Sequence, residues 1–551
     1  MVAAKIHAPD LVISLFCALK APASDTMELM LDHEVPILIA GGSLVGMSAA
    51  MLLAHHGVPS LTVEHHRGTA IHPRAAMISQ RTMEVLRTVG LEGIVRERSE
   101  TQFPQDGAIM SVETLAGKEL AWFIPNINEG VRDVSPTIRL FITQKLLEPL
   151  MQQRALELGA DLRFSTELVS FEQDSTGVSA VIRHRDTGVT ETVRARYMIA
   201  ADGARSSVRE RLGIAMLGRG VRSNSITIYF RAPVGPLLRD RNLSVIMVNN
   251  PTLRGFFRIE KPFESGFLVV NTTGDPANPN TDLWDGLDDQ RCIEYLRAAL
   301  GDDNIPLHID SVMKWNTRAD VAERLQQGRV FLAGDAAHVM PPYGGFGGNT
   351  GVQDAHNLAW KLALVVKGEA SPALLDTYEA ERRPVGAFTS EQAYMRYVTR
   401  EAKYLMTADL PRLENDLNIE LGYRYHSSAV LPDSGDDSRA HENPRESKGK
   451  PGARAPHLWL NPNLSTLDLF GKNFVLLIGT EGAVWGESAR AHRIDMHQIA
   501  HPDFCDAYGI SPQGAVLVRP DGFVAWRAKS ADAAPAAALA RAMATVLHSQ
   551  A

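Results

Sequence analysis

The chain has 551 residues, of which 45% are hydrophobic and 22% are charged, and its formal net charge is −8 at pH 7. This length predicts about three domains, and this composition is typical of a soluble globular protein. The acidic balance argues against a nucleic-acid partner, because a phosphate-binding surface usually carries a basic excess.

The beginning of the chain and its cysteines indicate where the protein works. An apolar stretch at residues 11–19 faintly imitates a signal peptide, but Lys20 interrupts it, so we expect residues 1–34 to be a disordered extension. No apolar run is long enough to predict a membrane span. The three cysteines form no CxxC pair, zinc spacing or disulfide framework, which favours a cytoplasmic protein without a metal. They are Cys17, Cys292 and Cys505.

The first elements predict a parallel sheet. Residues 36–40 form an apolar run that predicts a buried strand, residues 47–55 predict a helix, and residues 61–64 predict the next strand. A βαβ unit of this kind has parallel strands and a right-handed crossover. A long helix is predicted at residues 138–158, and residues 161–200 alternate as antiparallel strands do.

The second half of the chain predicts a second sheet, further helices and a separate tail. Residues 221–318 are rich in strand patterns, residues 330–333 read as a buried strand, and residues 353–367 and 372–405 read as helices. Residues 431–455 have the polar, Gly- and Pro-containing composition of a linker. After it, strands at residues 474–478 and 515–519, and one starting at Phe523, predict a small α/β domain.

The sequence GGSLVG at residues 41–46 lies between the first strand and the first helix, which is the position of a dinucleotide-binding fingerprint. Gly41 permits a tight turn, Gly46 permits close packing of helix and strand, and the helix N-terminus offers N–H groups to a pyrophosphate. Glu64 ends the next strand and can accept hydrogen bonds from ribose hydroxyls. Ser43 replaces the usual middle glycine, so the backbone approaches the phosphates less freely.

Two later segments follow strands in the same way. An apolar strand at residues 197–200 leads into Asp202 and Arg205, which alone is an ordinary turn with Asp202 capping a helix. Residues 329–362 contain a buried strand ending at Asp335, which could hold a sugar or ribityl hydroxyl. The glycine-rich loop at residues 344–351 can bring bare backbone against a flat ring, and the positive end of the next helix would point toward that ring. We expect a structural role for His338.

These three segments, in this order, resemble the group A flavoprotein monooxygenases, the aromatic-hydroxylase family that includes p-hydroxybenzoate and phenol hydroxylases. The resemblance runs from about residue 36 to residue 384, and the sequences LDTYEAERRP (375–384) and ELGYRY (420–425) extend it. It implies an α/β fold with a discontinuous, Rossmann-like FAD-binding domain and an antiparallel-sheet substrate domain. The implied boundaries are 35–220 and 319–430 for the FAD-binding domain and 221–318 for the substrate domain.

The resemblance also implies the residues that contact FAD. In the family pattern Arg74 faces the phosphate and ribityl region, Gln144 approaches the flavin, and Arg139 is a less certain contact. The segment with Asp202 and Arg205 is tied to both FAD and nicotinamide handling. The full set of implied FAD-binding residues is Gly41, Ser43, Gly46, Glu64, Arg74, Gln144, Asp202, Asp335, Gly347, Gly348 and Asn349.

The tail resembles the thioredoxin-like domain of phenol hydroxylases and large polyketide hydroxylases. The sequences PGARAPH (451–457) and VLVRPDG (516–522) carry this likeness. Because residues 456–551 contain no CxxC pair, a dithiol redox role is not expected. We expect a packing or homodimer-supporting domain.

The family mechanism is implied in full by the resemblance. Reduced nicotinamide, NAD(P)H, gives a hydride to FAD, and O2 then forms a C4a-hydroperoxyflavin that hydroxylates an electron-rich ring, here a polyketide-like phenol. Baeyer–Villiger-type oxygen insertion on the same fold stays open, as does a flavin-binding protein that sequesters an intermediate without turnover. No catalytic residue is assigned. Tyr229 and Tyr343 are candidates to polarise the substrate, although packing roles are favoured for both.

Overall fold

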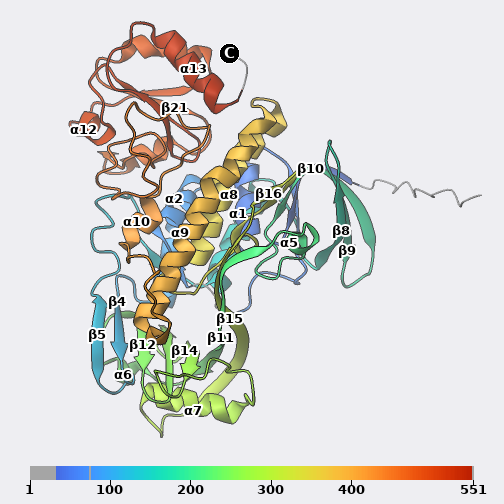
Figure 1. Cartoon of the computed structure of the whole chain (residues 1–551), viewed down its shortest axis with the longest axis vertical. Helices are drawn as coiled ribbons and strands as arrows, with labels where there is room; N and C mark the ends of the chain where they lie inside the picture. The colour runs from blue at the N-terminus through green and yellow to red at the C-terminus, as the bar shows by residue number, and fades with distance from the viewer. Residues whose placement is uncertain (1–32, 73–75, 549–551) are drawn as a thin grey trace, which may run out of the picture.

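The computed structural model describes residues 33–72 and 76–548. The extension expected at residues 1–34 lies almost wholly outside the described residues, and so does Arg74. Three units follow one another along the long axis of the molecule (Figure 1). The first unit is central and contains the long helices α8 and α9, the second surrounds α7 at one end, and the third contains β21 and α13 at the other end.

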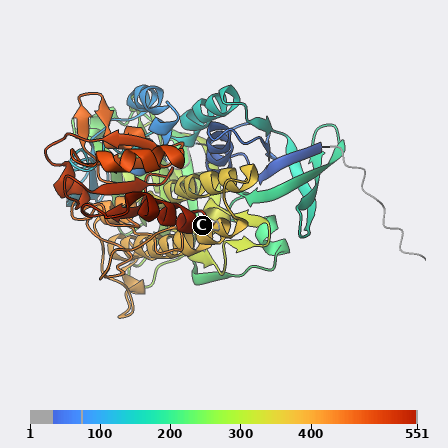
Figure 2. The same ribbon diagram turned by 90° about the horizontal axis from the view of Figure 1, so that it is seen from above.

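The first unit is built on a mixed eight-stranded sheet with the order β16-β17-β10-β1-β2-β7, to which the β8–β9 hairpin is added through β10. Strands β17, β10, β1, β2 and β7 are parallel neighbours, while β8, β9 and β10 pair antiparallel, as the sequence predicted. The hairpin projects to the side away from the third unit (Figure 1, Figure 2). The strands are β1 (His33–Ala40), β2 (Ser60–Val63), β7 (Asp161–Arg163), β8 (Thr166–Gln173), β9 (Val178–His184), β10 (Thr190–Ala200), β16 (Gln326–Gln327) and β17 (Val330–Leu332).

Two helices of the first unit begin at residues other than those predicted. The predicted helix at residues 138–158 is wrong in its first part. Residues 140–141 form strand β6, which pairs with β3, and the helix starts only at Gln144. The helix predicted at residues 353–367 starts earlier, at Phe346, because Gly345 takes a left-handed conformation with φ 65° just before it. The remaining elements are α1 (Leu44–His55), β3 (Met77–Ile78), α2 (Gln80–Thr88), α3 (Glu92–Gln102), β6 (Leu140–Phe141), α4 (Gln144–Glu157), α5 (Ser207–Arg211), η1 (Gly334–Ala336), α8 (Phe346–Lys367), η2 (Pro372–Leu375), α9 (Asp376–Arg400), η3 (Lys403–Leu405) and α10 (Asp416–Leu421).

The second unit is an eight-stranded sheet with the order β18-β15-β11-β14-β13-β12-β4-β5. Its pairs are antiparallel except for β12 with β4, which are parallel. The sheet reaches beyond the segment 221–318 expected for it, because residues 108–124 supply two of its strands. Its elements are β4 (Ala108–Val112), β5 (Glu119–Ile124), β11 (Met216–Arg231), α6 (Gly235–Leu238), β12 (Leu243–Asn249), β13 (Leu253–Glu260), β14 (Ser265–Thr273), α7 (Asp289–Leu300), β15 (His308–Ala322) and β18 (His338–Val339).

The two faces of this sheet have different partners, because successive side chains of a strand point to opposite faces. Ile226, Ile228 and Phe230 of β11 pack in a core with α7. Between them, Tyr229 points to the other face and joins a separate cluster with residues of α9 and of the loop before α8. The second sheet therefore presents an aromatic face to the first unit.

The third unit has a four-stranded sheet with the order β22-β21-β23-β24, in which β21 and β22 are parallel and the other pairs are antiparallel. A β-α-β unit followed by a helix, a hairpin and a last helix is the thioredoxin-like arrangement that the sequence predicted. Its elements are β19 (Trp459–Asn461), β20 (Leu464–Ser465), η4 (Thr466–Leu469), β21 (Val475–Ile478), η5 (Ala483–Trp485), α11 (Gly486–Ala491), β22 (Asp495–Gln498), α12 (Phe504–Tyr508), β23 (Ala515–Val518), β24 (Val524–Ala528) and α13 (Pro535–Val546).

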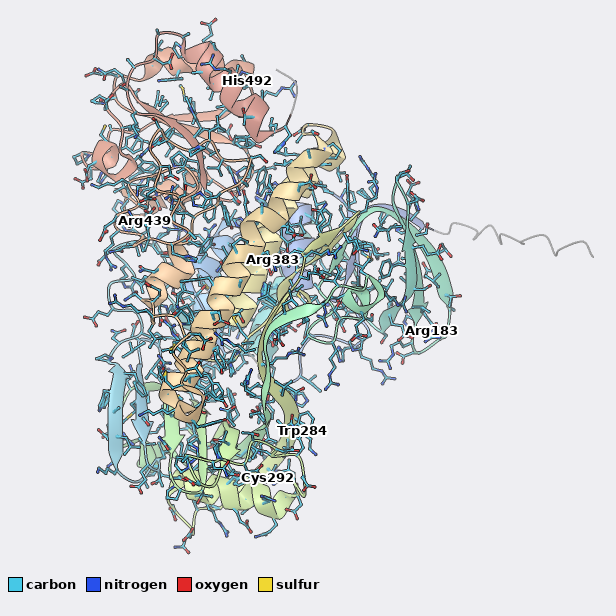
Figure 3. All side chains as sticks on the ribbon, in the orientation of Figure 1. Arg183, Trp284, Cys292, Arg383, Arg439 and His492 are labelled. Atoms are coloured by element: carbon cyan, nitrogen blue, oxygen red, sulfur yellow. The ribbon has the colours of Figure 1, made fainter. Side chains whose placement is uncertain are left out.

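The segment 431–455, expected to be a linker, is held against both neighbouring units by ion pairs. Arg454 Nε donates to Glu84 Oε2 of α2 in the first unit at 2.9 Å, and Arg527 Nε of β24 in the third unit donates to Asp433 Oδ2 at 3.1 Å. None of the helices in the described part of the chain is long and apolar enough to span a membrane. The two described cysteines are free thiols, and Figure 3 shows Cys292 at the opposite end of the molecule from His492 of the third unit.

Candidate active site

The three sequence motifs meet at one edge of the first sheet. Ala40 of β1 is in register with Ala200 of β10, and Ala200 with Leu332 of β17. The residues that follow these strands include Gly41, Asp202 and Asp335. Because the strands are parallel, their carboxyl ends lie at the same edge, which is where ligands bind in open α/β sheets.

The GGSLVG turn has the geometry that a phosphate-binding loop needs. Gly41 has φ 100°, and a Cβ at this residue would lie 2.3 Å from the carbonyl oxygen of Ala201. A Cβ on Gly46 would lie 1.8 Å from the carbonyl oxygen of Gly41. Ser43 precedes α1, but its hydroxyl donates to Glu148 Oε1 at 2.7 Å, and among the described residues no side chain caps this helix. The backbone N–H groups of the first turn of α1 can therefore serve a phosphate.

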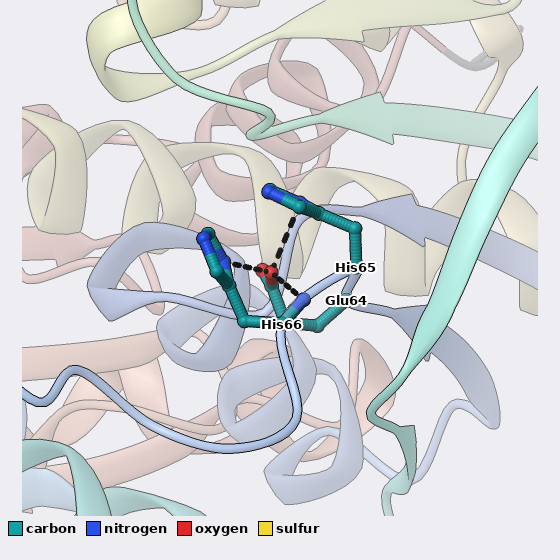
Figure 4. A group of neighbouring side chains, drawn as sticks. All are labelled: Glu64, His65 and His66. Atoms are coloured by element: carbon teal, nitrogen blue, oxygen red, sulfur yellow. Dashed lines mark hydrogen bonds and ion pairs between the residues drawn. The ribbon is translucent and has the colours of Figure 1, made fainter. Parts of the chain in front are cut away.

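Glu64 lies beside this turn and is bonded on both carboxylate oxygens. Its Oε2 accepts the N–H of Gly42 at 2.7 Å. Its Oε1 accepts the backbone N–H of His66 at 2.8 Å (Figure 4). The imidazoles of His65 and His66 lie 3.1 Å and 2.6 Å from Oε1, and both are exposed. Burial acts to raise the pKa of Glu64, but the hydrogen bonds from His66 and Gly42 hold it below its ordinary value. The group is an ionised acceptor suited to ribose hydroxyls.

Asp202 has one carboxylate oxygen available at the same edge. Its Oδ2 accepts the N–H of Val208 at 3.2 Å, while its Oδ1 is buried without a partner among the described residues. Ser206 is the residue that caps α5, by accepting the N–H of Arg209 at 3.0 Å. Arg205 is exposed. A buried acceptor without a partner fits a site that a bound group completes.

The third motif brings the start of α8 against the start of α1. Asp335 lies in the short helix η1 and its side chain is exposed. Gly334, with φ 62°, has no room for a Cβ, because Val45 Cγ2 of α1 would lie 2.7 Å away. A Cβ on Gly351 of α8 would lie 2.9 Å from Gly334 Cα. The turn containing Asp335 is thus fixed between the N-terminal turns of two helices.

The other residues expected to contact FAD fall into two groups. Gly347 and Gly348 are half-buried in the first turn of α8, and Gln144 is the first residue of α4 and is buried. Asn349 has its side chain engaged elsewhere: it accepts the N–H of Ser79 at 2.9 Å and donates to the carbonyl of Met77 at 3.0 Å. Its side chain therefore ties α8 to β3.

Arg139 has a structural role in this protein. Its Nη2 lies 2.5 Å from Glu420 Oε2, and both side chains are buried. The guanidinium also donates to the carbonyl oxygen of Ile127. The ELGYRY sequence thus contributes to the site by holding Arg139, which joins the segment before β6 to α10.

His338 belongs to a buried, hydrogen-bonded chain of side chains that sequence reasoning did not find. Its Nε2 lies 2.7 Å from Asp354 Oδ2, and Asp354 Oδ1 accepts Arg382 Nε at 2.7 Å. Asp354 Oδ2 also accepts the N–H of Gly334 at 3.0 Å, so this carboxylate fixes the turn that carries Asp335. The sequence signal was available, since Asp354 stands in a helix whose other residues are mostly buried.

Aromatic side chains form a layer between the second sheet and the first unit. Tyr229 and Phe267 have ring centroids 5.9 Å apart, Phe256 and Tyr343 are 6.1 Å apart, and Tyr343 and Tyr397 are 5.3 Å apart. Tyr343 stands just before the glycine loop of α8. We call this group the aromatic layer. A flat apolar ring would find stacking partners here, beside the loop that leads into α8.

A parallel sheet with a glycine turn at its carboxyl edge, joined to an antiparallel sheet that carries the aromatic layer on one face, is typical of a dinucleotide-binding protein. Comparison with known proteins identifies the family. A family model described as an FAD binding domain matches residues 34–393, and one described as the C-terminal domain of aromatic-ring hydroxylases matches residues 448–549. The chain belongs to the FAD-dependent aromatic-ring hydroxylases, and FAD is its cofactor.

Relatives of this chain match it over nearly its whole length. It is 51% identical to a 4-methyl-5-nitrocatechol 5-monooxygenase from Burkholderia sp, with 94% of this chain and 98% of the relative covered. It is 39% identical to a tetracenomycin A2 monooxygenase-dioxygenase from Streptomyces glaucescens, with 91% of this chain and 94% of that relative covered. The crystal structure of aklavinone-11 hydroxylase with FAD and aklavinone superposes with a TM-score of 0.86 at 34% identity, with 94% of this chain and 100% of that chain covered.

Proposed function

We propose that the protein is a monooxygenase that uses NAD(P)H and O2 to hydroxylate a phenolic aromatic ring. The observation that carries this proposal is that Tyr343 of the aromatic layer lies in the loop between Asp335 and α8, a helix whose first turns pack against Val45 of α1 and against Gly334. FAD, when bound, supplies the redox chemistry by accepting a hydride from the nicotinamide and activating O2. The side chains of this protein would bind the cofactor, orient the substrate and exclude water.

Each part of the site is assigned to a part of the cofactor. The turn of Gly41 and Gly46 and the first turn of α1 would hold the pyrophosphate, and Glu64 the adenosine ribose. Asp335, with Asp202 nearby, would hold hydroxyls on the ribityl side. The N-terminal turn of α8, with Gly347 and Gly348, would place positive partial charge beside the ring system, where reduced flavin is negative. The family pattern would place Gln144 toward the flavin and Arg74, which lies outside the described residues, toward the phosphate and ribityl region.

The substrate is a phenol or catechol in this proposal. The relatives are named for a nitrated catechol with one ring and for a tetracenomycin with several fused rings, so both ring sizes are candidates. The polyketide-like phenol expected from the sequence corresponds to the second kind, whereas the 51% identical relative favours the first. In both cases a ring hydroxyl makes the ring electron-rich enough to attack an electrophilic oxygen.

The test is oxidation of NADH and NADPH in air by the purified protein, with single-ring catechols and polycyclic phenols supplied in turn. We expect one substrate class to stimulate nicotinamide oxidation and to give a product that carries one additional hydroxyl group. A lactone or ester product would instead establish oxygen insertion into a ring or ketone. Bound flavin whose reduction no ring compound stimulates would favour sequestration without turnover.

A further inference from the structure

A buried carboxylic acid lies beneath the aromatic layer. Glu401 follows α9 at its C-terminal end, where this helix leaves the first unit and meets the second sheet. Its side chain is buried, with the residue only 7% exposed. Neither sequence motif nor cofactor assignment accounts for it.

The side-chain amide of Asn271 connects Glu401 to the second sheet and to Tyr343. Asn271 Nδ2, from β14 of the second sheet, donates to Glu401 Oε2 at 2.9 Å and to the hydroxyl oxygen of Tyr343 at 2.7 Å. The Asn271 amide oxygen in turn accepts the Ser225 hydroxyl at 3.0 Å. This network fixes the position of the carboxyl group between the second sheet and the loop that precedes the α8 glycines.

The other carboxyl oxygen of Glu401 is buried and, among the residues that the structure describes, has no hydrogen-bond partner. Two cations face this carboxyl group and act to lower its pKa, but neither donates a hydrogen bond to the open oxygen. Arg254 of β13 donates from Nε to Thr272 and from Nη2 to Gly274, its Nη1 is also buried without a partner among the described residues, and Arg400 stacks over the ring of Phe123. A buried carboxyl oxygen without a partner is costly, and such groups are retained where a ligand completes their bonding.

The titratable neighbours of Glu401 come from each element packed against it. They are Tyr343 from the loop before α8, Arg254 from β13, and Arg400 and Tyr397 from α9, and Tyr404 of η3 in turn interacts with Tyr397. Burial raises the pKa of Glu401 to about 7, although hydrogen bonds from Tyr343 and Asn271 act to lower it. A carboxyl group with this pKa can take up and release a proton at neutral pH, which suits a general base.

We propose that Glu401 is the catalytic base that deprotonates the hydroxyl group of the aromatic substrate, and that Asn271 is the positioning residue that orients it. This inference rests on the proposed hydroxylation of a phenol. The proton passes from the substrate oxygen to Glu401 Oε1, the O–H bond breaks, and its electron pair stays on the substrate as a phenolate. No electron is exchanged with another group in this step. The phenolate ring is the more nucleophilic form for oxygen transfer.

The test exploits the acidity of the substrate itself. A simple phenol ionises near pH 10, as tyrosine does, and needs a base at neutral pH. A nitro substituent on the same ring makes the hydroxyl acidic enough to be ionised without one. We would measure kcat/KM of wild-type, Glu401→Gln and Asn271→Leu proteins for such a matched pair, between about pH 6 and pH 9. Glu97→Gln on the exposed face of α3 is the control variant.

The base role predicts that Glu401→Gln loses about 100-fold or more in kcat/KM on the weakly acidic phenol and only a few-fold on the nitrated one. The loss should shrink as the pH approaches the pKa of the free substrate. Asn271→Leu should show the same selectivity with a smaller loss, and Glu97→Gln should match the wild type. Equal losses on both substrates, or no loss on either, would overturn the base role. A wild-type protein that oxidises nicotinamide with neither phenol would overturn the proposed function as well.

Discussion

Arg519, in the turn after β23, and Glu381, in the second turn of α9, form a two-bond ion pair in the interior although they are 138 residues apart in the chain. Arg519 Nη1 lies 2.6 Å from Glu381 Oε1, Nη2 lies 2.9 Å from Oε2, and both side chains are fully buried. Lys361 of α8 also reaches Glu381, at 2.8 Å. The third unit is thus joined to the two long helices, one of which begins at the proposed flavin site.

Replacing Arg519 by Met should destabilise the protein strongly. The change would leave Glu381 buried with only Lys361 to neutralise it, and removing one partner of a buried ion pair costs about 3–5 kcal/mol. The measurement is the midpoint of urea unfolding. Arg183→Met provides the control, because Arg183 pairs with Glu167 on the exposed face of the β8–β9 hairpin and exposed pairs contribute at most about 1 kcal/mol. Similar midpoints for the two variants would show that the buried pair does not stabilise the junction.

Gly46→Ala should remove FAD without unfolding the protein. The added methyl group would lie 1.8 Å from the carbonyl oxygen of Gly41, so the phosphate-binding turn and α1 must separate. The flavin absorbance per protein after purification reports the result. Gly93→Ala on α3 is the matched control, since a Cβ there meets no atom within 4 Å. A Gly46→Ala protein with full flavin content would contradict the assignment of this turn.

Asp335→Ala should also lose flavin, because the exposed carboxylate at the sheet edge is the proposed ribityl contact. Asp335→Asn keeps a hydrogen-bond acceptor of similar shape and should lose less. Flavin content measured by absorbance, and FAD affinity measured by fluorescence titration of the stripped proteins, give the comparison. Unchanged affinity in the Ala variant would move the ribityl contact to another residue.

Glu401 should make stability depend on pH in a definite direction. Its pKa is raised to about 7 in the folded protein, from an ordinary value of 4.5. Below pH 4.5 the group is protonated in both states; as the pH rises through the folded pKa, the folded state loses stability relative to the unfolded state. The free energy of unfolding should fall by about 3 kcal/mol from this group alone. The difference between wild type and Glu401→Gln, followed by urea unfolding across this pH range, should change accordingly, and a constant difference would contradict the raised pKa.

The sequence was most informative where a backbone constraint has a residue signature. Glycines at 41 and 46 lie where a Cβ would collide, and the apolar runs at 36–40 and 330–333 are buried strands. These patterns led to the fold and to the edge where the motifs meet. The thioredoxin-like tail could be predicted equally well, because its strands are short apolar runs separated by turn residues.

The sequence was less informative where tertiary contacts determine the local structure or the role of a residue. Residues 140–141 pair with β3 as a strand although their pattern continues into a helix, and residues 108–124 leave the first unit to join the second sheet. Glu401 and Glu148 depend on partners far away in the chain, so periodicity and spacing give no sign of them. Asn349 was predicted to contact FAD, and its side chain is bonded to the backbone of Ser79 and Met77, contacts that the sequence does not reveal.

The most direct test of the central claim is oxygen incorporation under ¹⁸O2. The purified, FAD-loaded protein would be supplied with reduced nicotinamide and the phenol or catechol that most stimulates its oxidation, and the product would be analysed by mass spectrometry. The account predicts a hydroxylated product that carries one ¹⁸O atom from O2. A product with oxygen derived only from water, or a protein that cannot be loaded with FAD, would contradict it.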